Sequence, residues 1–178
     1  MVERPTFFPN TPVATKLIIS YREAWIPNLY DPHRRECVAF SVQSACSSHE
    51  IPLEWVLKLH NIPGSANFEG YWDGLREHLE SLPFIEGVQF ENISDFNNLL
   101  EKISTMDEGY RLLLMLYPKE WRAHLVHVID VTSRVLGKGS AILVNDNEKG
   151  IRKIGKREFG NNIASGALYN CIFFKEAD

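Results

Sequence analysis

Five short apolar segments fill the second half of the chain, and their spacing restricts the fold more than any other feature. They are rich in β-branched and aromatic residues, and turn residues such as Pro118, Gly166 and the Gly137–Gly139 group separate them. The segments span residues 111–117, 124–132, 140–144, 150–154 and 168–174. This pattern predicts a run of strands, interrupted only by a short helix over 156–159, and favours an antiparallel sheet.

The first half of the chain has helical periodicity instead. Apolar residues recur at spacings of three and four, which predicts helices on which one face is buried. The expected helices cover residues 37–48, 53–60 and 69–82, and a further one begins after Ser94 as its N-cap. Two more strands are expected at 16–21 and 88–93. Helices first and strands afterwards predict an α+β fold, with helices packed on one side of a twisted antiparallel sheet.

Length and composition fit a single domain over residues 1–178, with an extended, proline-rich arm at 1–13. The net charge of −4 shows no basic bias, so we expect no nucleic-acid partner. The longest apolar run, at 112–117, is too short to cross a membrane, and no secretory signal is visible. Three cysteines without a CxxC pair favour reduced thiols and a cytoplasmic protein, and we expect no metal or other cofactor.

Cys37 stands at the predicted start of a helix whose apolar face carries Val38, Val42 and Cys46. Unpaired backbone N–H groups and the helix dipole favour an anion at such a position, and thiolate is the reactive form of cysteine. A lone cysteine is more often a small buried hydrophobe, which is how we interpret Cys46 and Cys171. Cys37 is therefore a candidate nucleophile that needs a base.

The segment Arg122-Ala-His-Leu-Val-His-Val-Ile-Asp-Val131 supplies a candidate base. If residues 124–132 and 140–144 pair as a hairpin, His124 lies close to the polar end of the next strand, where Asp146 can orient its ring. Asn145 and Asn147 are the neighbouring alternatives. His124 and His127 fall on opposite faces of a strand, so an exchange of their roles stays open. A cysteine, a histidine and a carboxylate are the groups of thiol-dependent acyl transfer.

These three segments resemble papain-like cysteine peptidases, and most closely the bacteriocin-leader (double-glycine) peptidase-like domains. The resemblance rests on Glu36-Cys37-Val38-Ala39, on His124 at the head of an apolar strand, and on Val144-Asn-Asp146 at the end of the next strand. It covers about residues 30 to 175. It implies a papain-like fold and hydrolysis of a peptide or isopeptide bond in a peptide or protein substrate by Cys37, His124 and Asp146.

The chain departs from that family at the oxyanion hole. The family carries a glutamine a few residues before the cysteine, whereas Asp31 stands six residues before Cys37, and Asn28 and His33 are the other polar groups nearby. Two further functions therefore stay open: acyl transfer by the same triad to an acceptor other than water, and a non-catalytic binding module that retains the fold.

Overall fold

The structure is a computed structural model that describes residues 33–46, 48–64, 66–107, 109–116, 123–132, 140–163 and 167–177. The expected arm at 1–13, the expected strand at 16–21, and Asn28 and Asp31 lie outside these residues. The helices are α2 (His33–Ala45), α3 (Leu53–Lys58), the 3-10 turn η1 (Leu59–Asn61), α4 (Glu69–Glu80), α5 (Phe96–Thr105) and α6 (Lys156–Asn162).

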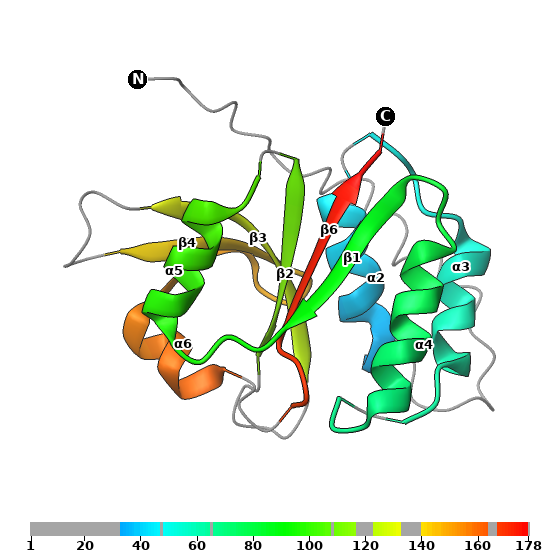
Figure 1. Cartoon of the computed structure of the whole chain (residues 1–178), viewed down its shortest axis with the longest axis horizontal. Helices are drawn as coiled ribbons and strands as arrows, with labels where there is room; N and C mark the ends of the chain where they lie inside the picture. Colours follow the sequence, from blue (N-terminus) through cyan, green and yellow to red (C-terminus); the bar gives the residue numbers. More distant parts are fainter. Residues whose placement is uncertain are drawn as a thin grey trace.

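Six strands form one antiparallel sheet, in the spatial order β1-β6-β2-β3-β4-β5. They are β1 (Ile85–Glu91), β2 (Tyr110–Leu116), β3 (His124–Thr132), β4 (Ala141–Asp146), β5 (Gly150–Gly155) and β6 (Cys171–Glu176). Strands β2, β3, β4 and β5 lie side by side in sequence order, and β6 lies between β1 and β2 (Figure 1). The predicted α+β class and the antiparallel sheet are confirmed.

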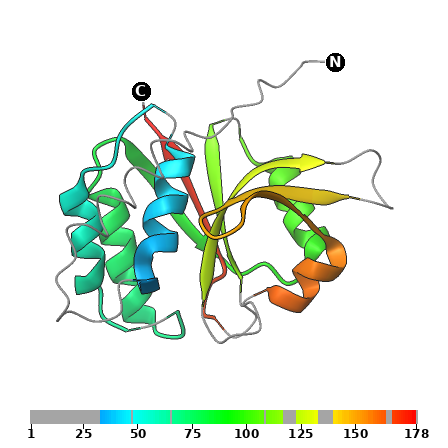
Figure 2. The same cartoon turned by 180° about the vertical axis from the view of Figure 1, so that it is seen from behind.

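Helices cover both faces of the sheet, so the expectation that they cover one side is wrong. Side chains alternate along each strand and feed two separate cores. Leu113 and Leu125 pack in the core with α2, α3 and α4, whereas Leu114 and Val126 pack in the core with α5 and α6. Figures 1 and 2 show the two helix groups flanking the sheet. The central strands are apolar on both faces for this reason.

Several element boundaries differ from the predictions; β1, for example, spans Ile85–Glu91 rather than 88–93. Asp95, and not Ser94, caps α5, because its carboxylate accepts the Asn98 amide at 2.9 Å. The last strand begins at Cys171 rather than at residue 168. Just before it, the backbone of Asn170 bonds Glu91 and Met115, and its side chain bonds both backbone groups of Ile93. No described helix is long and apolar enough to span a membrane.

Helix α2 lies against β3, β2 and β4 and is buried from Glu36 to Cys46 (Figure 2). Small residues such as Ala39 and Ala45 let it sit close to the sheet. The helix begins at His33, four residues earlier than the sequence predicts. Cys37 therefore lies in the second turn, where an α-helix pairs its amide with the carbonyl four residues before it.

Candidate active site

His124 and Asp146 meet at the end of the sheet. The register pairs His127 of β3 with Asn145 of β4, so His124 extends past the last paired position of β4. From there its Nε2 lies 2.9 Å from Oδ1 of Asp146, and both side chains are nearly inaccessible to solvent. The expected contact is thus present, and it involves Asp146 rather than Asn145 or Asn147.

Cys37 reaches the same ring from α2. Its side chain lies near enough to the imidazole of His124 to help raise the pKa of that ring. Because Nε2 is held by Asp146, Nδ1 is the nitrogen left for the sulfur. Three segments far apart in the sequence therefore come together as the sequence analysis expects, and their catalytic role stays a prediction.

The surroundings of His124 favour its protonated form. Burial alone would lower the pKa of His124, but hydrogen bonds to Asp146 and Cys37, and the negative charges of both, outweigh it and raise the pKa to about 10. At neutral pH the ring is an imidazolium between a carboxylate and a sulfur. This is the charge distribution that a thiolate nucleophile requires.

Asp146 is held in place by more than His124. Its Oδ1 also accepts the amides of Glu148 at 2.9 Å and Lys149 at 3.3 Å, and its Oδ2 accepts Nε of Arg152 at 3.2 Å. Burial would raise the pKa of Asp146, but the bond and charge of His124, with the Glu148 amide and Arg152, hold it well below its usual value. The carboxylate stays ionised and fixed.

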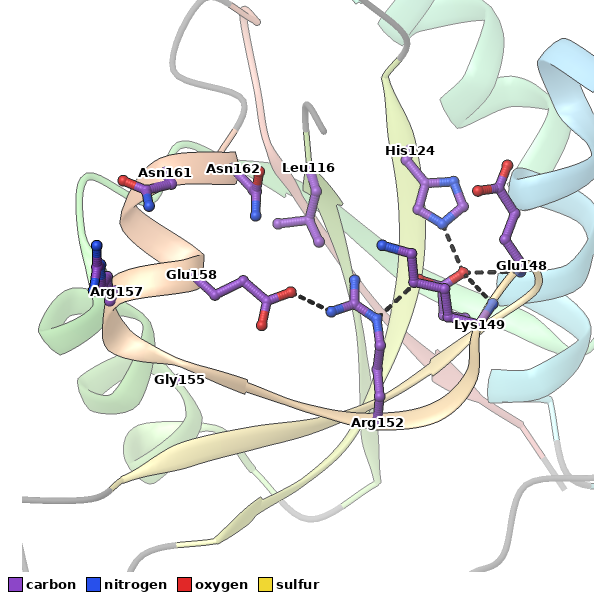
Figure 3. Close-up of a pocket in the computed structure, with 11 residues that line it drawn as sticks. Leu116, His124, Glu148, Lys149, Arg152, Gly155, Arg157, Glu158, Asn161 and Asn162 are labelled. Carbon is purple, nitrogen blue, oxygen red and sulfur yellow. Dashed lines mark hydrogen bonds and ion pairs between the residues drawn. The ribbon is translucent and has the colours of Figure 1, made fainter. Parts of the chain in front are cut away.

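Arg152 is the residue that the sequence analysis missed. It lies on β5 opposite Val144, two residues before Asp146, so its side chain reaches Asp146 diagonally across the strand pair. Its other end pairs with Glu158 of α6 (Figure 3). A predicted register for the hairpin at 141–155 would have revealed this neighbour.

An open pocket of about 780 Å³ adjoins the site on the α6 side of the sheet (Figure 3). His124 and Asp146 form part of its wall, and Arg152 crosses it to reach Glu158. The remaining wall consists of Leu116, Glu148, Lys149, Gly155, Arg157, Asn161 and Asn162. Cations and carboxylates alternate around it, so the wall has no single sign of charge.

His127 occupies a different place from His124. Its Nδ1 lies 2.8 Å from Oγ of Ser44, seven residues beyond Cys37 along α2. Burial and the nearby charge of Arg111 lower the pKa of His127 to about 3, so it is neutral at physiological pH. The structure therefore brings Cys37 to His124, and the exchanged assignment of the two histidines is not the observed geometry.

The other two cysteines are packing residues in the structure. Cys46 and Cys171 are free and fully buried. Burial raises the pKa of Cys46 to about 12, with Glu176 adding to the rise and Arg111 opposing it. Burial also raises the pKa of Cys171, so both thiols stay protonated at neutral pH.

In the part of the chain that the structure describes, no group of three or more His, Cys, Asp or Glu side chains is arranged so that it could hold a metal ion. The side chain of His33 and the whole of Trp121, which the sequence places three residues before His124, lie outside that part. Comparison of the sequence with models of known protein families and with curated proteins finds no match.

Proposed function

We propose that the protein is a thiol-dependent hydrolase of peptide or isopeptide bonds, with Cys37 as nucleophile, His124 as acid and base, and Asp146 as the residue that orients His124. One observation carries this proposal: a single imidazole is bonded by Asp146 through Nε2 and has the Cys37 side chain as a second partner that raises its pKa. The resemblance of the three segments to papain-like cysteine peptidases supports it.

Each group has a defined task in the proposed reaction. The Cys37 thiolate attacks the carbonyl carbon, and a tetrahedral intermediate forms. The His124 imidazolium then protonates the leaving amine as the C–N bond breaks, which leaves a thioester on Cys37. The neutral ring next takes a proton from water, whose oxygen attacks the thioester. The acid product departs and the thiolate–imidazolium pair returns, while Asp146 stabilises the charged ring throughout.

A non-catalytic binding module is the second candidate, and the start of α2 favours it. The amide of Cys37 lies inside the helix, where the carbonyl of His33 accepts it. A paired amide cannot also bind the oxyanion of a tetrahedral intermediate, and an oxyanion-hole donor contributes about 3 kcal/mol to catalysis. A hydrolase built on this site requires donors other than the Cys37 amide.

The test is the reaction with a small activated ester, such as a p-nitrophenyl ester of an N-acylated amino acid. We expect a burst of nitrophenol equal to the protein concentration, followed by steady release as the thioester hydrolyses. Intact-mass analysis should find the acyl group on Cys37. Added hydroxylamine diverts the product to the hydroxamate if an amine competes with water, which measures acyl transfer.

His124→Ala is the matched control, because it retains the thiol and removes the base. The burst should slow by at least about 100-fold in this variant, the usual contribution of a positioned acid–base group. A burst of equal rate in wild type and His124→Ala would mean that the thiol reacts unaided. Acylation of Cys37 without any later release would favour the binding module instead.

A further inference from the structure

The rotation of α2 about its own axis needs an explanation, because the helix is buried from Glu36 to Cys46. Hydrophobic burial is non-directional, so a helix enclosed by apolar side chains gains similar energy at several rotations. Hydrogen bonds between buried polar groups are directional and costly to leave unmade. The buried polar side chains of α2 therefore determine which face of the helix packs against the sheet.

Ser44 is the centre of a buried polar cluster with His127 and Asn145, which we call the Ser44 cluster. Nδ2 of Asn145 donates to Oγ of Ser44 at 2.9 Å. The serine hydroxyl is then free to donate to Nδ1 of His127, 2.8 Å away. Among the described residues, Oδ1 of Asn145 has no hydrogen-bond partner, so Ser44 is what holds this side chain.

The Ser44 cluster and the candidate triad are built from the same three elements, with one residue each from α2, β3 and β4. Each member follows or precedes a triad residue on the same element: Ser44 lies seven residues after Cys37, His127 three after His124, and Asn145 one before Asp146. Seven helical residues rise about 10.5 Å and three strand residues about 10 Å, so the two sets of contacts match when α2 runs alongside β3.

A further contact between α2 and β3, located between the triad and the Ser44 cluster, fits the same alignment. Ser41 donates to the carbonyl of Leu125 at 2.9 Å. Cys37, Ser41 and Ser44 are spaced by four and three residues, so they share one face of the helix. Along this face, the three residues contact in the same order the ring of His124 at the end of the sheet, the carbonyl of Leu125 and the ring of His127.

We propose that Ser44 and His127 are positioning residues: the Ser44 cluster sets the rotation and register of α2 against β3 and β4, and thereby aims Cys37 at His124. This inference rests on the proposed function, since it concerns the geometry of the same thiol and imidazole. His127 acts as a neutral acceptor, which keeps a second positive charge away from His124.

The test measures the rate of Cys37 alkylation by iodoacetamide from pH 5 to 10 in folded variants, with peptide mapping to isolate Cys37. In Ser44→Ala the hydroxyl is lost and Asn145 is released, so the midpoint of the pH profile should rise by roughly one pH unit, a tenfold loss of thiolate below the midpoint. His127→Leu should do the same. His127→Asn, which keeps an acceptor near the Nδ1 position, should recover most of the wild-type profile.

Val42→Ala is the control for stability, because Val42 is fully buried on α2 and makes no side-chain hydrogen bond. It should lower the melting temperature and leave the pH profile unchanged. If His127→Leu fails to fold, Ser44→Ala decides the matter alone. A wild-type midpoint in folded Ser44→Ala, or an equal shift in Val42→Ala, overturns the inference. A wild-type profile that His124→Ala does not alter would instead overturn the proposed function.

Discussion

Replacement of Asp146 by asparagine tests the electrostatics of the site most directly. Asparagine has the shape of aspartate and retains a carbonyl oxygen toward Nε2 of His124, but it lacks the negative charge. The protonated ring of His124 then loses a charge-assisted hydrogen bond, while its burial is unchanged. The pKa of His124 should therefore fall toward its ordinary value of 6.5.

The size of the effect follows from the wild-type geometry. At about 1.36 kcal/mol per pH unit, the rise from 6.5 to about 10 corresponds to about 5 kcal/mol of preference for the protonated ring. Asp146 and Cys37 share this preference. A hydrogen bond to a charged group contributes about 1.5–3 kcal/mol, so Asp146→Asn should lower the titration midpoint of His124 by about 1–2 pH units.

Nuclear magnetic resonance of the histidine ring protons measures that midpoint directly, and the spectrum of His124→Gln identifies the resonance. Asp130→Asn is the matched control, because Asp130 is an exposed carboxylate on the same strand and the change of charge is identical. It should leave the midpoint of His124 in place. An unchanged midpoint in Asp146→Asn, or an equal fall in both variants, would refute the assignment.

The same interaction makes stability depend on pH. A histidine whose pKa is raised on folding stabilises the native state fully below pH 6.5, and this contribution disappears as the pH rises through about 10. Wild-type protein should therefore lose stability over that interval in thermal denaturation. Asp146→Asn should lose less over the same interval, because part of the contribution is already absent.

Two further measurements address the cysteines and the second core. Cys37 should react with iodoacetamide well before Cys46 and Cys171 at neutral pH, because burial keeps the latter two thiols protonated; preferential labelling of Cys171 in peptide maps would count against an activated Cys37. Phe159→Ala should destabilise the fold by about 3–5 kcal/mol in urea denaturation, because this side chain is fully buried, whereas the exposed Phe68→Ala should cost less than about 0.5 kcal/mol.

The sequence by itself determined the fold class and the members of the candidate site. Helical spacing in the first half and short apolar segments in the second half record which faces are buried, and burial is a local property of each element. Strand β3 spans His124–Thr132, the range expected from its apolar run. Antiparallel pairing of β3 with β4 then placed Asp146 near His124, since neighbouring strands joined by a turn usually pair.

The tertiary structure alone decided the features that depend on contacts between distant segments. Strand β2 is apolar from Leu112 to Leu116 and shows no alternation there, so its sequence did not tell that α5 and α6 cover the second face. Arg152 looks like an ordinary strand cation until the register brings it to Asp146. Ser44 and His127 are 83 residues apart, and each alone is an unremarkable buried side chain. Their hydrogen bond forms only when α2 packs against the sheet, because a hydrogen bond requires two partners at the right distance and direction.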